Sequence, residues 1–302
     1  MTANFQPAIK WSGSKRLQAP TIARFFPSFS TYYEPFLGGG SILFHVNPVR
    51  AVCGDICGPL IEFWKVVKTN PKALIDSYKR NWEKLREQGH THFYEVRDRF
   101  NANQNPFDLL FLSRTCVNGL IRFNTDGQFN NSLHHTRKGI EPIKLARILL
   151  SWSIRIKDVE FVQGDYRDTT RTATRRDFIY LDPPYFYTKG RYYGRIDFED
   201  FVEYLQEMDA KGVRFALSFD GSRGNIKFPV EFPRDLFKRS FLINNGNSTF
   251  RKVMDQRVEK VREALYLNWL ESETNLLSYP SRAGLSSLSN SVANLVFSKS
   301  SE

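Results

Sequence analysis

Apolar positions recur along the chain in two patterns, as short continuous runs and as longer stripes with helical spacing. The continuous runs predict buried strands at 32–36, 51–54, 159–162, 177–182, 213–218 and 263–269. The stripes predict helices at 58–68, 71–86, 92–101 and 106–117, and a later helix that begins after Asp197 and ends at Gly212. Strands that alternate with helices at these spacings predict an α/β fold with a doubly wound, Rossmann-like parallel sheet.

A block of helical stripes between the second and third predicted strands interrupts this alternation. We therefore expect a sheet-bearing domain from residues 1–56 and 151–272, and an inserted, mainly helical domain from residues 57–150. Inside the insertion, Asp126-Gly127 lies among the alternating residues of 120–130 and predicts a β-hairpin. The final part of the chain, 273–302, is rich in serine and is expected to form a separate tail.

The charge balance predicts a polyanionic binding partner. The 302 residues include 43 Lys and Arg against 32 Asp and Glu, a formal net charge of +11, and the sequence pI is near 9.5. A strongly basic chain attracts polyanions, and nucleic acid is the commonest of these. Hydrophobic residues at 41% and charged residues at 25% are typical of a globular protein and exclude collagen-like or globally disordered chains.

The cysteines, the histidines and the lengths of the apolar runs bear on disulfides, metal binding and membrane association. Cys53, Cys57 and Cys116 cannot build a disulfide framework, and their spacing fits no common zinc pattern. The five histidines form no convincing cluster, so no metal is expected. The cysteine usage makes a reducing cytoplasm the expected setting. No stretch approaches the ~20 uncharged apolar residues that span a bilayer, so no membrane partner is expected.

The segment Glu34-Pro-Phe-Leu-Gly-Gly-Gly-Ser41 directly follows a predicted strand. Its glycines allow close approach of a ligand, and the helix that begins after them offers free N–H groups to an anion. Asp55, at the end of the next strand, can accept hydrogen bonds from both hydroxyls of a ribose. This pattern predicts a cofactor that contains a nucleoside. The alternative is a plain strand–helix turn, and the spacing does not match the GxGxxG of dinucleotide sites.

A second candidate segment, Asp182-Pro183-Pro184-Tyr185, ends another apolar strand. Its prolines stiffen the backbone and lack N–H groups, which leaves their carbonyl oxygens as acceptors. Asp182 and the Pro183 carbonyl can accept both hydrogens of an exocyclic amine, and Tyr185 can stack on the ring that carries it. The segment therefore predicts a site for a planar amino-heterocycle at the carboxyl edge of the sheet, and the alternative is an ordinary turn.

In this order the motifs resemble the DNA adenine methylase family, the class D12, alpha-group, of N6-adenine DNA methyltransferases. The resemblance covers roughly residues 8–270, and the stretch 92–129 is most similar to EcoRV-type modification methylases. Departures from the family pattern are Ser14 for a glycine, Cys57 for an asparagine and Val117 for an aromatic residue. The segments that carry the resemblance are KWSGSK (10–15), EPFLGGGS (34–41), Asp55, Arg114, NGLIRFN (118–124), Gly127, Phe129-Asn130 and DPPY (182–185).

The resemblance implies a site-specific enzyme that transfers a methyl group from S-adenosylmethionine to N6 of a flipped-out adenine in double-stranded DNA, without a metal. The sheet-bearing domain would be catalytic, and 57–150 would recognise the target. The implied catalytic residues are Asp182, Pro183, Pro184 and Tyr185. The implied cofactor-binding residues are Trp11, Lys15, Phe36, Gly38, Gly40, Asp55, Asp165, Tyr166 and Asp182. The implied DNA-binding residues are Lys10, Asn118, Leu120, Arg122 and Asn124.

Several alternatives stay open at this point. Arg122 could grip guanine O6 and N7 in the major groove, contact a phosphate or remain a solvated charge. Cytosine-N4 or RNA-adenine methylation is the nearest rival activity, and an inert DNA-binding protein is a rival from another class. Cytosine-C5 methylation is disfavoured because no cysteine follows a proline.

The expected partners and setting follow from the implied activity. The main partner is double-stranded DNA, at a site that contains GAT. A cognate restriction endonuclease that acts on the same site is a further candidate partner. We expect a monomer in the cytoplasm, associated with the nucleoid when it is bound to DNA.

Overall fold

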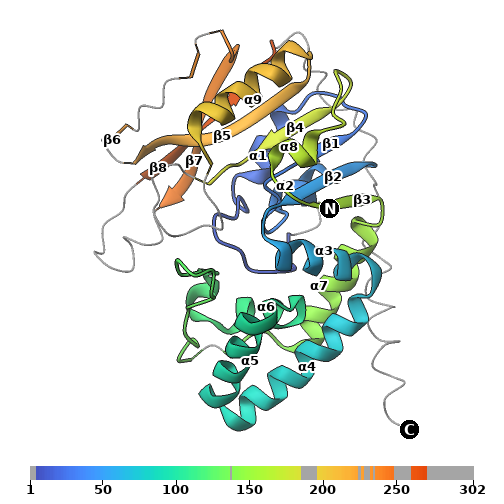
Figure 1. Cartoon of the computed structure of the whole chain (residues 1–302), viewed down its shortest axis with the longest axis vertical. Helices are drawn as coiled ribbons and strands as arrows, with labels where there is room; N and C mark the ends of the chain where they lie inside the picture. Colours follow the sequence, from blue (N-terminus) through green and yellow to red (C-terminus); the bar gives the residue numbers. More distant parts are fainter. Residues whose placement is uncertain are drawn as a thin grey trace.

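The computed structural model of the chain describes residues 5–136, 138–184, 196–223, 226–227, 232–233, 235–247 and 260–270. The molecule is elongated, with a sheet and its covering helices at one end and a helical block at the other (Figure 1). Tyr185 and the serine-rich tail 273–302 lie outside the described residues.

A single sheet, with strand order β3-β2-β1-β4-β5-β8-β7 and β6 paired to β5, forms the centre of the first region. Neighbouring strands from β3 to β5 run parallel, which confirms the predicted doubly wound, Rossmann-like arrangement. The strands are β1 Tyr32–Glu34, β2 Ala51–Asp55, β3 Val159–Gln163, β4 Phe178–Leu181, β5 Arg214–Arg223, β6 Ile226–Lys227, β7 Arg239–Asn247 and β8 Lys260–Leu267.

The strand expected at 263–269 belongs to β8, which departs from the parallel arrangement of the strands from β3 to β5. β8 pairs antiparallel with both β5 and β7. β8 lies between β5 and β7 in the sheet, so β5 and β7 run in the same direction. β8 follows β7 in the chain and pairs directly with it, and consecutive strands that pair in this way run antiparallel.

The predicted helices at 58–68, 71–86, 92–101 and 106–117 are confirmed to within a few residues. A further helix, α7, crosses residue 150 and packs against α3 and α4. The helices are α1 Ala19–Ile22, η1 Ala23–Phe25, α2 Ser41–Val46, α3 Gly58–Thr69, α4 Pro71–Gln88, α5 His90–Asn103, α6 Pro106–Thr115, η2 Val117–Gly119, α7 Pro142–Arg155, α8 Tyr166–Thr170 and α9 Phe198–Ala210.

Local capping signals place several of these helix starts. The Asn70 side chain accepts a hydrogen bond from the N–H of Ala73 at the start of α4, and Asn105 caps α6 in the same way. Proline at the first position of both helices suits a site where an N–H would be unpaired. Asp197 caps α9 as the sequence predicts.

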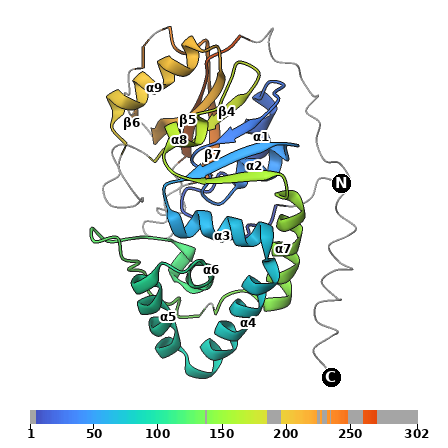
Figure 2. The ribbon, with the colours of Figure 1, turned by 45° about the vertical axis from the view of Figure 1, so that its right-hand side comes forward.

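Buried side chains cover both faces of the sheet. Along β4, Phe178 and Tyr180 belong to one apolar cluster, and Ile179 and Leu181 belong to another. Successive side chains of a strand point to opposite faces, so helices must pack on both sides. α9 covers one face, and α1 and α2 lie on the other (Figures 1 and 2).

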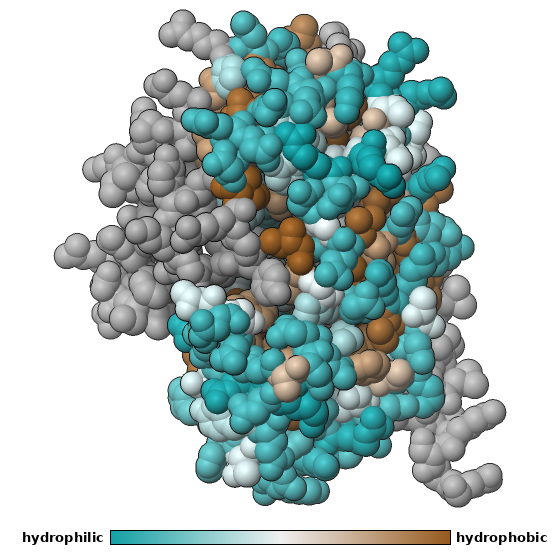
Figure 3. Space-filling model, viewed as in Figure 1, coloured by the Kyte–Doolittle hydropathy of each residue, from teal (hydrophilic) through white to brown (hydrophobic). Residues whose placement is uncertain are grey.

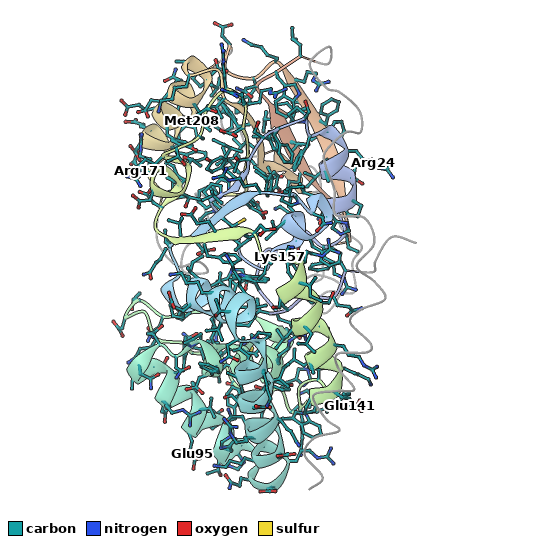
Figure 4. The ribbon with its side chains drawn as sticks, turned by 90° about the vertical axis from the view of Figure 1, so that its right-hand side faces the viewer. Arg24, Glu95, Glu141, Lys157, Arg171 and Met208 are labelled. Carbon is teal, nitrogen blue, oxygen red and sulfur yellow. The ribbon has the colours of Figure 1, made fainter. Side chains whose placement is uncertain are left out.

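The helical region presents a polar exterior. Figure 3 shows a mainly hydrophilic surface over α4, α5 and α6. In Figure 4, Glu95 and Glu141 lie toward the end of the helical region that is remote from the sheet, whereas Lys157 lies where α7 leads into β3. Exposed cations on α4 include Lys72, Lys79, Arg80, Lys84 and Arg86.

The predicted hairpin at 120–130 forms as a chain reversal held by isolated bridges. Phe123 bridges to Phe129, and Asn124 Oδ1 accepts hydrogen bonds from the backbone N–H of Asp126 at 3.0 Å and of Gln128 at 2.8 Å. These side-chain bonds add to backbone bonds across the turn, from Asn124 N–H to the Gln128 carbonyl at 2.9 Å and from Asn130 N–H to the Arg122 carbonyl at 3.1 Å. The reversal lies on the side of α6 that faces the sheet (Figure 1).

Candidate functional site

A cavity of about 260 Å³ lies at the carboxyl ends of the central parallel strands. Loops that follow β1, β2, β3 and β4 meet there because the carboxyl ends of parallel strands share one edge of the sheet. The lining includes the segments 11–15, 36–39, 55–56, 165–166, 182–184 and 196–197, together with Glu34, Ser41, Ile42, Ile121, Phe123 and Asp200. Two segments predicted separately from sequence, the glycine loop and Asp182-Pro183-Pro184, therefore share one cavity.

Trp11 lies against the glycine loop. Gly38 has φ +49°, and a Cβ built on it would be 2.9 Å from Trp11 Cδ1. The loop therefore needs glycine both for its backbone conformation and for this contact. Gly40 is also required, because its φ is +68° and a Cβ built on it would lie 3.1 Å from Trp64 and Trp152. It is not among the described residues that line the cavity.

Asp55 is oriented by two backbone donors. Gly38 N–H donates to Oδ2 at 3.1 Å, and Cys57 N–H donates to Oδ1 at 3.0 Å. Burial raises the pKa of Asp55 to about 6, and these two hydrogen bonds oppose that rise. Each carboxylate oxygen keeps a further lone pair, so the fixed group can accept from two neighbouring hydroxyls.

Asp182 contacts a buried lysine at the rim of the same cavity. Lys15 Nζ lies 2.9 Å from Asp182 Oδ1 and also forms a close ion pair with Glu263 of β8. Burial raises the pKa of Asp182 to about 7, while Lys15 lowers it and Glu263 raises it further. The Asp182 side chain remains 19% exposed, so the ion pair does not close the cavity.

Two buried glutamates belong to this region although sequence reasoning assigned them no role. Glu34 lines the cavity, accepts a hydrogen bond from Tyr32 Oη at 2.8 Å, and has its pKa raised to about 8 by burial. Glu263 is 3% exposed and pairs with Lys15. The available signal for Glu263 was a charged residue at the head of an apolar strand.

One end of the cavity is acidic. Asp165 caps α8 by accepting hydrogen bonds from Arg167 N–H at 2.8 Å and Asp168 N–H at 2.9 Å. Asp200 of α9 accepts a hydrogen bond from Tyr166 Oη and forms an ion pair with Arg167 at 3.0 Å. Asp197, predicted from the sequence only as a helix cap, lines this end as well. Such an arrangement suits a ligand with several N–H or O–H donors.

The residues implied to bind DNA lie in or against the reversal between α6 and α7. None of the five residues implied to bind DNA lines the cavity, whereas Ile121 and Phe123, which neighbour three of them in the chain, do. The chain alternates here: Ile121 is buried, Arg122 is exposed, and Phe123 is half-buried. The five residues are Lys10, Asn118, Leu120, Arg122 and Asn124.

Specific contacts set the form of this reversal. Arg122 Nε donates to Asn130 Oδ1 at 2.9 Å, which holds the guanidinium at the surface. Leu120 is 41% exposed, a large apolar side chain open to solvent. Gly119 has φ +62°, and a Cβ there would lie 2.4 Å from Lys10 Cδ, so Lys10 packs directly on this turn.

The described part of the chain has neither a membrane-spanning helix nor a cluster of metal ligands. No helix in it is both long enough and apolar enough to cross a bilayer. It also contains no group of three or more His, Cys, Asp or Glu side chains that could hold a metal ion.

Comparison with known proteins places this cavity in context. The D12 class N6 adenine-specific DNA methyltransferase family matches residues 11–252. The chain is 27% identical over 238 residues to the type II methyltransferase M1.LlaDCHI of Lactococcus lactis subsp. cremoris, covering 72% of this chain and 82% of that protein. It is 30% identical over 243 residues to the type II methyltransferase M.MjaIII of Methanocaldococcus jannaschii, covering 70% and 83%. A DNA adenine methylase of Serratia marcescens is 30% identical over 184 residues, covering 59% and 66%. The family match includes every segment that lines the cavity.

Proposed function

The chain belongs to the D12 class of N6 adenine-specific DNA methyltransferases, and we propose that its cavity transfers a methyl group from S-adenosylmethionine to an adenine held at Asp182. The observation that carries this proposal is the position of Asp182, Pro183 and Pro184 at the rim of a cavity that also contains the glycine loop and Asp55. A base bound at Asp182 and a nucleoside cofactor bound at Asp55 would share one enclosed space.

The chemistry of the lining fits the cofactor. Asp55 offers two oriented oxygens to the ribose hydroxyls, and Trp11 and Phe36 provide apolar walls. Asp165 and Tyr166 lie at the acidic end, where they suit the amino group and ring of an adenine. When bound, S-adenosylmethionine supplies a methyl group already activated on a positively charged sulfur.

The residues at the rim would orient the acceptor amine. Lys15 engages Oδ1 of Asp182, so Oδ2 and the Pro183 carbonyl oxygen are the acceptors for the two hydrogens of N6. Both bonds localise the nitrogen lone pair and direct it at the methyl carbon. Methyl transfer would form the N6–C bond as the S–C bond of the bound cofactor breaks, and Asp182 or solvent would take the proton that N6 releases. Tyr185 would stack on the extruded base.

The reversal beside the cavity is proposed to bind the duplex. Lys10, Asn118, Leu120 and Arg122 lie together there, and Asn124 forms its turn. Arg122 is exposed and oriented by Asn130, as a bidentate contact to guanine requires. The adenine must leave the stack to reach Asp182, and the exposed Leu120 can occupy space in the opened duplex.

We propose that the protein acts as a monomer, with residues 1–56 and 151–272 catalytic and 57–150 recognising a target that contains GAT. The relatives named type II methyltransferases support a role in restriction–modification, with a cognate endonuclease as partner. Sequencing of methylated bases in cells with and without the protein would identify the target.

Methyl incorporation into unmethylated DNA tests the proposal. Purified protein, labelled S-adenosylmethionine and duplex DNA should yield N6-methyladenine on nucleoside analysis. Asp182→Ala should lower the rate by about a thousandfold or more, because both orientation and charge are lost. Glu203→Ala, at an exposed position on α9 outside residues 57–150, is the matched control and should retain the rate.

Other outcomes separate the alternatives. Labelled N4-methylcytosine or labelled RNA would favour the rival activities. Tight binding of DNA without binding of cofactor would favour an inert DNA-binding protein. An Asp182→Ala variant that transfers methyl groups at the wild-type rate would contradict the mechanism.

A further inference from the structure

Asn101, near the carboxyl end of α5, binds the chain reversal at 120–130 through both groups of its side-chain amide. Its Nδ2 donates a hydrogen bond to the carbonyl oxygen of Phe129 at 3.1 Å, and its Oδ1 accepts one from the N–H of Phe129 at 2.8 Å. An amide that pairs with both backbone groups of one residue takes the place of a neighbouring β-strand. Asparagine is a poor helix former, so helix propensity does not explain its presence here.

The register of the reversal explains why Phe129 needs this partner. Phe123 and Phe129 lie opposite each other, and the hydrogen bonds between the two arms are made by the residues on either side of this pair. In such an antiparallel pair, the N–H and the carbonyl of each residue point away from the opposite arm. Phe129 is 1% exposed, so loss of Asn101 would leave two buried backbone groups unpaired, which is costly.

Aromatic packing supports the same contact without fixing its register. Phe100 precedes Asn101 on α5, and its ring centroid lies 6.4 Å from that of Phe123 and 6.2 Å from that of Phe129. Apolar contacts are non-directional, whereas hydrogen bonds to the backbone of one residue require a defined geometry. Asn101 therefore sets where the arm that contains Phe129 lies on α5.

The arm that Asn101 holds also carries the partner of Arg122. Asn130 follows Phe129, and its Oδ1 accepts a hydrogen bond from Arg122 Nε at 2.9 Å, while its carbonyl oxygen accepts one from Nη2 at 3.4 Å. These bonds use the Nε–Nη2 edge of the guanidinium. The Nη1–Nη2 edge has donors of its own and is the edge that can meet O6 and N7 of guanine. A shift of Phe129 therefore moves Asn130, and with it Arg122.

We propose that Asn101 is a positioning residue for DNA recognition. It docks the chain reversal on α5 and so fixes the Nη1–Nη2 edge of Arg122 for a guanine of the target. This inference rests on the proposed function, which assigns the reversal to the duplex. Asn101 is not among the described residues that line the cavity, so it should affect the binding of DNA and not that of the cofactor.

Asn101→Ala tests the inference through the KM for DNA and through the Kd of a duplex, measured by fluorescence anisotropy at one salt concentration. We expect both to rise about tenfold, while kcat at saturating DNA stays within about threefold. The Kd of S-adenosylmethionine, measured by calorimetry, should stay within about twofold. In an Arg122→Ala background, Asn101→Ala should change the KM by less than about twofold, because the side chain that it positions is already absent.

Tyr78→Phe is the matched control for a loss of buried hydrogen bonds. Tyr78 Oη also serves both backbone groups of one residue: it donates to the Ile140 carbonyl at 2.9 Å and accepts from the Ile140 N–H at 2.9 Å. Ile140 lies outside the reversal. Tyr78→Phe should therefore lower the free energy of unfolding but leave the KM for DNA within about twofold.

Asn101→Asp keeps the test decisive where Asn101→Ala does not fold. It retains an acceptor for the Phe129 N–H and loses the donor to the Phe129 carbonyl, so the KM for DNA should rise by about threefold to fivefold. Asn103→Asp is its charge control, at an exposed position two residues along α5, and keeps an acceptor for the N–H of Asn105. It should match the wild type, and an equal KM in the two variants would overturn the inference.

Three further results would also overturn the inference. They are a KM for DNA that Asn101→Ala raises no more than Tyr78→Phe does, a cofactor affinity that weakens in step with the DNA affinity, and a full effect of Asn101→Ala in the Arg122→Ala background. In each case a wild-type protein that methylates adenine leaves the proposed function standing. A wild-type protein that transfers no methyl group, but whose duplex binding depends on Asn101 as expected, would contradict the proposed function and support the positioning role.

Discussion

Ser12 Oγ donates a hydrogen bond to the backbone carbonyl of Ile121 at 3.1 Å. Ser12 belongs to the segment that contains Trp11 and Lys15, and Ile121 immediately precedes Arg122 in the chain reversal at 120–130. Both residues also line the cavity. The bond therefore joins a wall of the proposed cofactor site to the backbone that presents the proposed DNA-binding side chains.

Ser12→Ala should loosen this connection. Loss of a side-chain to backbone hydrogen bond destabilises its segment by about 1 kcal/mol. We expect the KM for DNA to rise by about threefold to tenfold while the global unfolding free energy changes little. Steady-state kinetics with varied duplex concentration measures the effect. Ser153→Ala removes a comparable bond, from Ser153 Oγ to the Lys68 carbonyl at 3.3 Å, and should leave the KM unchanged. Equal effects of the two substitutions would argue against a link.

Gly40→Ala should destabilise the fold rather than alter the cavity directly. Gly40 has φ +68°, and an added Cβ would meet Trp64 and Trp152 at 3.1 Å. Strain at positive φ costs about 1 kcal/mol, and overpacking of two buried tryptophans adds about 1–3 kcal/mol. Urea denaturation gives the difference in unfolding free energy.

Gly127→Ala is the matched control for this prediction. Gly127 has a similar φ of +74°, but no heavy atom outside its chain neighbours lies within 4 Å of the added Cβ. Gly127→Ala should therefore lower the free energy of unfolding only by the backbone strain at positive φ, about 1 kcal/mol. If the two variants are equally unstable, the tryptophan packing does not contribute.

The empty protein should lose stability as the pH rises from about 6.5 to 8. Burial raises the pKa of Glu34 to about 8 and that of Asp182 to about 7, whereas both groups titrate near 4 in an unfolded chain. In this window the native state therefore holds more protons than the unfolded state. Each rise in pH then favours unfolding, by up to about 1 kcal/mol per pH unit for each group.

Thermal unfolding across this pH range, with and without Glu34→Gln, measures the contribution of Glu34. The variant should show a shallower slope, while the exposed Glu87→Gln should match the wild type. Burial lowers the pKa of His45 and His92, so both reduce stability on the acid side, below about pH 6.5. A slope that Glu34→Gln leaves unchanged would show that this carboxyl is ionised in the native state.

Local patterns in the chain were sufficient for much of the fold. Apolar runs and helical stripes predicted the parallel strands and the helices of the insertion, because burial of one face imposes a period that the sequence carries. The glycine loop, Asp55 and Asp182-Pro183-Pro184 were also predictable. Each follows a strand of a parallel sheet, and the carboxyl ends of such strands meet at one edge.

Other features depended on contacts between distant segments. The pairing of Lys15 with Glu263, the bond from Ser12 to Ile121, and the antiparallel direction of β8 have no local signature. Arg114 is a further case: its buried guanidinium donates to the backbone carbonyl oxygens of Pro7 and Ala8, which fixes the approach to Trp11. A sequence period reports which face of an element is buried, but not which distant element covers it. Only the tertiary structure decides which charges share a buried space, and here that decides the electrostatics of the site.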